Sequence, residues 1–130
     1  MRVLLDTLIA LWAVVGSKRL APQAKAAILT ADEVFVSSAS LWEIAIKHGL
    51  RRGDMPMSSA QALRAFNDAG HGLLNIRPEH VLMVEQLAPL HNDPFDRMLV
   101  AHALAEIDHA RCVGRKLQRG HHEGRLNRRA

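Results

Sequence analysis

The sequence predicts a single α/β domain with a central parallel sheet between two layers of helices. Three short apolar runs, Arg2–Leu5, Val34–Val36 and Leu73–Ile76, are typical of buried strands. Helical stretches separate them, and strands that alternate with helices favour a parallel sheet. A chain of 130 residues can bury one sizeable core. No apolar stretch approaches the ~18 to 20 residues of a membrane span, so no membrane association is expected.

In the first half of the chain, each predicted strand leads into a helix. Leu8–Val15 has apolar residues at helical spacing, and Pro22 suits the first turn of a second helix that continues through Leu29. After the second strand, Ser40 is the predicted N-cap of a helix over 41–48. Glu43, three residues later, completes a capping-box spacing.

The second half repeats the pattern with three more helices. Ser58 is placed to cap a helix that reaches about Ala69, and Pro78 opens another that ends near Leu87. The last predicted helix runs from Asp93 to about Glu106. The predicted domain core therefore covers residues 1–106.

The end of the chain, residues 107–130, departs from this pattern. Seven of its side chains are Lys or Arg, all within 111–130, and this segment accounts for the net charge of +4. Asp108–Gly114 carries charge where a buried parallel strand should be almost continuously apolar. We expect a divergent basic segment, partly disordered, and a solvated tail is favoured over nonspecific binding of phosphate backbones.

Two acids begin the late helix, in the run Asn92-Asp93-Pro94-Phe95-Asp96. Asp93 precedes a proline, where an N-cap is expected. Capping does not explain Asp96 as well, because Asp is a poor helix former beyond the first positions. Asp96 is therefore a candidate for chemistry.

Two further acids lie in similar contexts, because Asp6 ends the first strand and Glu43 lies near the start of the helix after the second. If the strands are parallel neighbours, Asp6, Glu43 and Asp96 converge at one edge of the sheet. Clustered carboxylates repel one another unless a cation compensates, and oxygen ligands favour Mg²⁺ or Mn²⁺ over zinc. The sequence thus predicts a divalent-metal site suited to phosphodiester hydrolysis.

Three motifs carry a resemblance to a known family. They are Leu4-Leu5-Asp6-Thr7 with Leu11-Trp12, the segment from Val36 to Lys47, and the segment from Pro89 to Ala101. Over residues 1–106 the chain resembles PIN-domain ribonucleases, and within them the VapC-type toxins of bacterial toxin–antitoxin pairs.

The resemblance implies a compact α/β/α sandwich and Mg²⁺- or Mn²⁺-dependent cleavage of RNA. It also implies a homodimer and a heteromeric complex with a VapB-like antitoxin. Carried over by motif, Asp6, Glu43 and Asp96 are the metal-site acids, and Asp93 is a cap or an auxiliary residue. Thr7 and Ser38 would be polar neighbours of the site, while Arg97 and Lys47 are candidates for phosphate contact or for exposed ion pairs.

The chain departs from the family pattern at two positions. Leu8 stands where a histidine is common, and Gly114 stands where a fourth acid usually follows the last strand in a Thr-x-Asp-like motif. Two alternatives therefore stay open. One is a catalytically weakened or inactive PIN-like protein that binds antitoxin or RNA, and the other is a nuclease directed at DNA.

The remaining notable residues have less specific interpretations. The single cysteine, Cys112, excludes an internal disulfide framework and suits a reducing cytoplasm, where we place the protein. Trp12 and Trp42 lie on apolar helical faces and are expected in the core. His91 and His102 lie near the predicted site and are candidates for substrate contacts.

Overall fold

The computed structural model describes residues 1–51, 55–87, 93–106 and 111–113. Four strands are present in these ranges: β1 (Arg2–Leu5), β2 (Glu33–Ser37), β3 (Gly72–Leu74) and β4 (Arg111–Val113). The helices are α1 (Thr7–Val15), α2 (Pro22–Thr30), α3 (Ser38–Gly49), α4 (Ser59–Asp68), α5 (Pro78–Gln86) and α6 (Pro94–Glu106). Within the described residues, none of these helices is long and apolar enough to cross a membrane.

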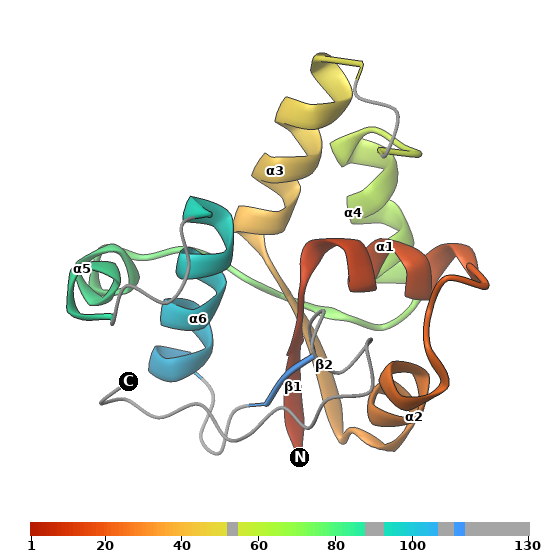
Figure 1. Ribbon diagram of the computed structural model, residues 1–130, viewed down its shortest axis with the longest axis horizontal. Coiled ribbons are helices and arrows are strands. Elements are labelled where there is room, and N and C mark those ends of the chain that lie inside the picture. Colours follow the sequence, from red (N-terminus) through yellow and green to blue (C-terminus); the bar gives the residue numbers. More distant parts are fainter. Residues whose placement is uncertain (52–54, 88–92, 107–110, 114–130) are drawn as a thin grey trace.

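The strands form one parallel sheet in the order β3-β2-β1-β4. β1 is central, with Val3 opposite Val34 of β2 and Leu5 opposite Val113 of β4. Both β1 and β2 run almost directly into a helix, α1 and α3 respectively (Figure 1). The predicted α/β architecture with a central parallel sheet is confirmed.

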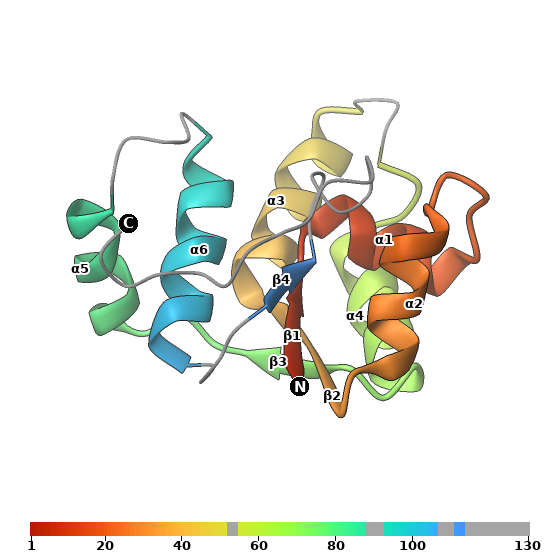
Figure 2. The same cartoon turned by 60° about the horizontal axis from the view of Figure 1, so that its bottom comes forward.

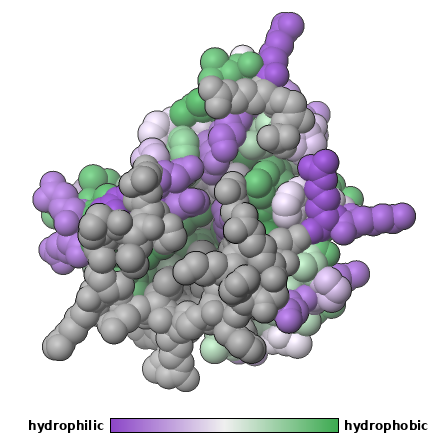
Figure 3. Space-filling model, in the orientation of Figure 1, coloured by the Kyte–Doolittle hydropathy of each residue, from purple (hydrophilic) through white to green (hydrophobic). Residues whose placement is uncertain are grey.

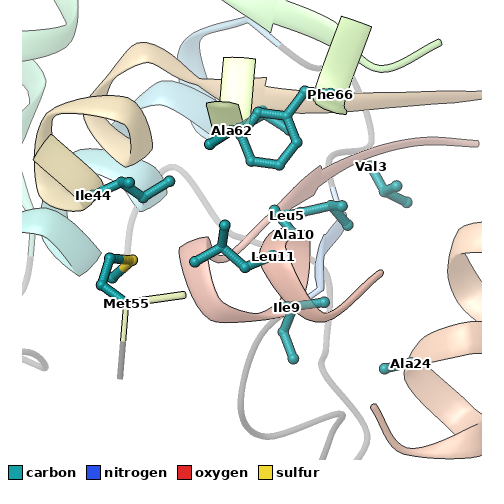
Figure 4. Close-up of a cluster of buried hydrophobic side chains, with 11 residues drawn as sticks. Val3, Leu5, Ile9, Ala10, Leu11, Ala24, Ile44, Met55, Ala62 and Phe66 are labelled. Carbon is teal, nitrogen blue, oxygen red and sulfur yellow. The ribbon is translucent and has the colours of Figure 1, made fainter. Parts of the chain in front are cut away.

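Helices cover both faces of the sheet, and the alternation of side chains along β1 shows how. Val3 and Leu5 belong to a larger apolar cluster, whereas Leu4 points into a smaller one on the other face. The larger cluster brings together side chains of α1, α2, α3 and α4 (Figure 4). The smaller cluster includes Leu99 and Ala103 of α6. α5 packs beside α6, and these two helices lie apart from α1, α2 and α4 (Figures 1 and 2).

The sequence made Asp108–Gly114 a poor candidate for a strand, and the structure forms the three-residue strand β4 there. Its three residues pair with β1 in parallel. β4 lies at the edge of the sheet, where a strand needs a partner on one side only. The pairing uses backbone groups, which are the same for every residue except proline, so a poor sequence pattern does not prevent it.

The start of α3 also differs from the prediction, because the N-cap is Ser37 and not Ser40. The hydroxyl of Ser37 accepts a hydrogen bond of 3.0 Å from the backbone N–H of Ala39. β2 continues into α3 without a loop, so the first serine of the run caps the helix. The Ser58 cap is confirmed, and it forms a full capping box with Gln61.

Candidate functional site

Two nearly buried carboxylates lie close to the carboxyl ends of neighbouring strands. Asp6 follows β1 in extended backbone conformation and is 9% exposed, and its side chain does not cap α1. Glu43, on α3, is 6% exposed. α3 begins at Ser38, so Glu43 lies in its second turn. The capping box predicted from the spacing between Ser40 and Glu43 is therefore wrong. Burying a carboxylate is unfavourable without a compensating charge or hydrogen bonds.

Lys47 compensates the charge of Glu43 from one turn further along α3. Its Nζ lies 2.5 Å from Oε2 of Glu43, and its side chain is 30% exposed against 8% for Glu43. Of the two interpretations offered for Lys47, the structure shows the ion pair, although the pair is half-buried and not fully exposed. The ammonium group of Lys47 thus supplies a positive charge next to the Glu43 carboxylate.

Asp93 caps the start of α6, as predicted, whereas the role of Asp96 stays a prediction. Oδ1 of Asp93 accepts hydrogen bonds from the backbone N–H groups of Phe95 and Asp96, at 2.8 and 3.3 Å. Asp93 is therefore the cap. The side chain of Asp96 is half-buried in the first turn of the helix.

Two buried hydrogen bonds link α1, which Asp6 immediately precedes, and α6, which carries Asp96, to the start of α3, which carries Glu43. Thr7, the first residue of α1, donates to the hydroxyl of Ser40 on α3 at 2.8 Å. The hydroxyl of Ser37 lies 2.9 Å from Nδ1 of His102 on α6. We call these four residues the polar seam. All four are at most 1% exposed, so the seam fixes α1 and α6 to the start of α3 in the absence of water.

The other predicted auxiliary residues hold neighbouring segments. The hydroxyl of Ser38 accepts a hydrogen bond of 3.1 Å from the backbone N–H of Ile76, which fastens the segment after β3 to α3. The guanidinium of Arg97 donates to the carbonyl of Val84 at 2.8 Å and so ties α6 to α5. A role for Arg97 in phosphate binding stays a prediction.

The structure places Asp6 directly before α1, Glu43 on α3 and Asp96 on α6, but it does not join the three in one cluster. Within the described ranges, no three Asp, Glu, His or Cys side chains stand close enough together to hold a metal ion. The donor set itself fits a hard cation, because it consists of carboxylate oxygens and two of its members are nearly buried. The predicted position of the fourth acid, Gly114, lies outside the described residues.

Two predictions about individual side chains are corrected, and one contact was not predicted. Trp42 is 60% exposed and is not a core residue, whereas Trp12 packs against the larger cluster as predicted. His102 is fully buried, so it cannot contact a substrate, and His91 lies outside the described residues. The ring of His102 lies against that of His80 of α5, with centroids 4.2 Å apart. No local pattern marked His80, because this contact forms only when α5 and α6 pack.

Comparisons with known proteins agree with this architecture. The model of the PIN domain family matches residues 3–107. Among solved structures, the chain matches one chain of the crystal structure of VapBC2 from Rickettsia felis bound to a DNA fragment from their promoter. The two share 16% sequence identity with a TM-score of 0.52, over 85% of this chain and 86% of that one. No curated protein sequence matches the chain.

Proposed function

Because the chain belongs to the PIN domain family, we propose that it is a divalent-metal-dependent endoribonuclease and the toxin of a toxin–antitoxin pair. The observation that carries the proposal is the pair of nearly buried carboxylates, Asp6 and Glu43, next to the carboxyl ends of β1 and β2. Neither side chain caps its helix. Ligands of open parallel sheets bind at this edge, so the position supports a catalytic use.

Asp6 and Asp96 would be direct ligands of Mg²⁺ or Mn²⁺, with Glu43 as a further ligand or as the group that orients the attacking water. A bound ion supplies activation of water, stabilisation of the leaving oxygen and neutralisation of phosphate charge. The chain itself contributes placement: the polar seam fixes α1, α3 and α6, and Lys47 balances Glu43. Ligand placement within a few tenths of an ångström requires such a supporting shell.

Partners follow from the same proposal. The neighbouring structure is a VapBC complex on DNA, which supports an antitoxin partner of the VapB kind and a heteromeric complex. The substrate would be RNA in the cytoplasm, and the toxin would form a homodimer. Specificity for an RNA sequence would depend on contacts outside the acids.

Purified Asp6→Asn and Asp96→Asn variants test the metal-site assignment. We expect both to lose divalent-dependent RNA cleavage and to bind Mn²⁺ more weakly by calorimetry, with the fold intact by circular dichroism. Asp68→Asn, at the exposed end of α4, is the matched control and should behave as the wild type. Full cleavage by either site variant would exclude the assignment, and parallel assays on RNA and DNA would identify the substrate.

A second function, binding without cleavage, is favoured by two observations. No three metal-binding side chains cluster in the described part of the chain, and the sequence after β4 continues with glycine where the family usually has an acid. Such a protein would sequester antitoxin or RNA as a regulator. Expression without antitoxin separates the two functions: growth arrest that requires Asp6 supports the enzyme, and growth unaffected by the protein supports the regulator.

A further inference from the structure

Trp42 and Phe95 form an aromatic pair at the surface where α3 meets α6. Their ring centroids are 5.0 Å apart with an interplanar angle of 66°, an edge-to-face contact. Trp42 immediately precedes Glu43 on α3, and Phe95 immediately precedes Asp96 on α6. The two rings thus branch from the same helical turns as two of the three candidate acids, one from each helix.

Trp42 is more exposed to solvent than the other aromatic residues of the chain. There are two tryptophans, three phenylalanines and no tyrosine. Phe66 is buried in the larger cluster, Trp12 packs against it, and Phe35 packs against the smaller one. Trp42 instead leaves 60% of its surface in water, so it forgoes much of the stabilisation that burial of a large ring gives. Phe95, half-buried, supports one edge of the indole ring.

We propose that Trp42, held by Phe95, is a stacking platform for a nucleobase of single-stranded RNA whose phosphate lies at the acids. The proposal rests on the proposed ribonuclease function. Proteins that bind single-stranded nucleic acid stack bases on exposed aromatic rings, because every base has a flat π-face. A base fixed beside Glu43 and Asp96 brings a neighbouring phosphodiester to the carboxylates, which would otherwise repel it.

The row of exposed apolar residues along α3 helps to distinguish a nucleobase from a protein partner as the ligand of Trp42. Ile46 and Leu50 continue from Trp42 at four-residue spacing and are 38% and 61% exposed. These aliphatic residues lie toward the end of α3 that is furthest from the sheet, where Figure 3 shows hydrophobic surface. The aromatic contact, in contrast, occurs at the end of the row that carries the acids. A base needs this end alone, whereas a partner helix would need the whole row.

Fluorescence provides a direct test, because Trp12→Phe leaves Trp42 as the only tryptophan. In this background, titration with an eight-nucleotide single-stranded RNA without divalent ions should quench the emission of Trp42. We expect Trp42→Leu to weaken RNA binding by roughly tenfold to a hundredfold and Trp42→Phe to restore part of the affinity. Leu50→Ala, which removes an equally exposed apolar side chain of the same row, should bind RNA as the wild type does.

Three results would overturn the proposal. RNA cleavage that depends on Asp6 together with unchanged Trp42 emission and unchanged affinity of Trp42→Leu would exclude stacking and leave the ribonuclease function intact. Equal losses of affinity in Leu50→Ala and Trp42→Leu would indicate a general apolar surface. Emission that depends on protein concentration and not on RNA, with self-association lost in Trp42→Leu by sedimentation, would assign the pair to an interface between protein chains. If the wild type neither binds nor cleaves RNA, the result contradicts the proposed ribonuclease function itself, and the stacking proposal with it.

Discussion

The larger apolar cluster and the polar seam both involve α1 and α3, yet they stabilise the fold in different ways. The cluster is made of interchangeable apolar contacts, whose contribution grows with the area removed from water. The seam consists of directional bonds between four particular side chains. Loss of cluster contacts therefore lowers stability in general, whereas loss of a seam bond changes where a helix lies.

The largest effect on stability is expected from Phe66→Ala in the cluster. Phe66 is 2% exposed, and such a truncation leaves a cavity that costs about 3–5 kcal/mol. The free energy of unfolding, measured with urea, should fall by this amount, while the cleavage rate per folded molecule stays unchanged. A large loss of that rate would show that cluster and site are not separable.

His102→Leu breaks the seam with only a small change of side-chain volume. The hydroxyl of Ser37 keeps the hydrogen bond from Ala39 but loses its imidazole partner, and the loss of such a buried hydrogen bond costs about 1–3 kcal/mol. Because the bond fixes α6, which carries Asp96, we expect cleavage per folded molecule to fall by at least tenfold. Wild-type cleavage by a destabilised variant would reduce His102 to a packing residue.

Ser40→Ala allows a finer comparison. Its control is Ser58→Ala, which removes a serine with a hydrogen bond of similar energy far from the site. Each variant should lose about 1 kcal/mol of unfolding free energy. Cleavage and Mn²⁺ affinity should fall in Ser40→Ala, because the Thr7–Ser40 bond no longer holds Asp6 in place relative to Glu43. Neither should fall in Ser58→Ala. Ser40→Thr, which keeps the hydroxyl, should restore part of both. Identical behaviour of the two alanine variants would contradict a positioning role.

The smallest expected effect is a dependence of stability on pH that arises from His71, next to the larger cluster. Burial lowers the pKa of His71, whose ring stacks on Phe66 with centroids 6.4 Å apart. The unfolded state then binds more protons than the folded state, so stability decreases as the pH falls below about 6.5, the ordinary value for histidine. In His71→Phe, the loss of stability between pH 7.5 and pH 5.5 should be smaller than in the wild type. An unchanged pH profile would exclude His71 as its source.

Local sequence signals predicted much of the fold and of the candidate site. The apolar runs gave β1 and β2, and the Ser58 capping box marked the start of α4. Asp93 was recognised as a cap from the proline that follows it. The choice of Ser37 over Ser40 as a cap could not be predicted, because it depends on the exact residue at which β2 leaves the sheet. β4 was missed because its pairing uses backbone groups that carry no sequence pattern.

The sequence by itself determined the order of strands and helices and the residues that carry the candidate chemistry, because both depend on neighbours along the chain. Only the tertiary structure decided that Trp42 is exposed against Phe95, that Glu43 is nearly buried, and that His102 is a buried link between helices. These properties depend on which faces meet when α3, α5 and α6 pack. Burial and long-range hydrogen bonds arise from that packing, and no local pattern of residues specifies them.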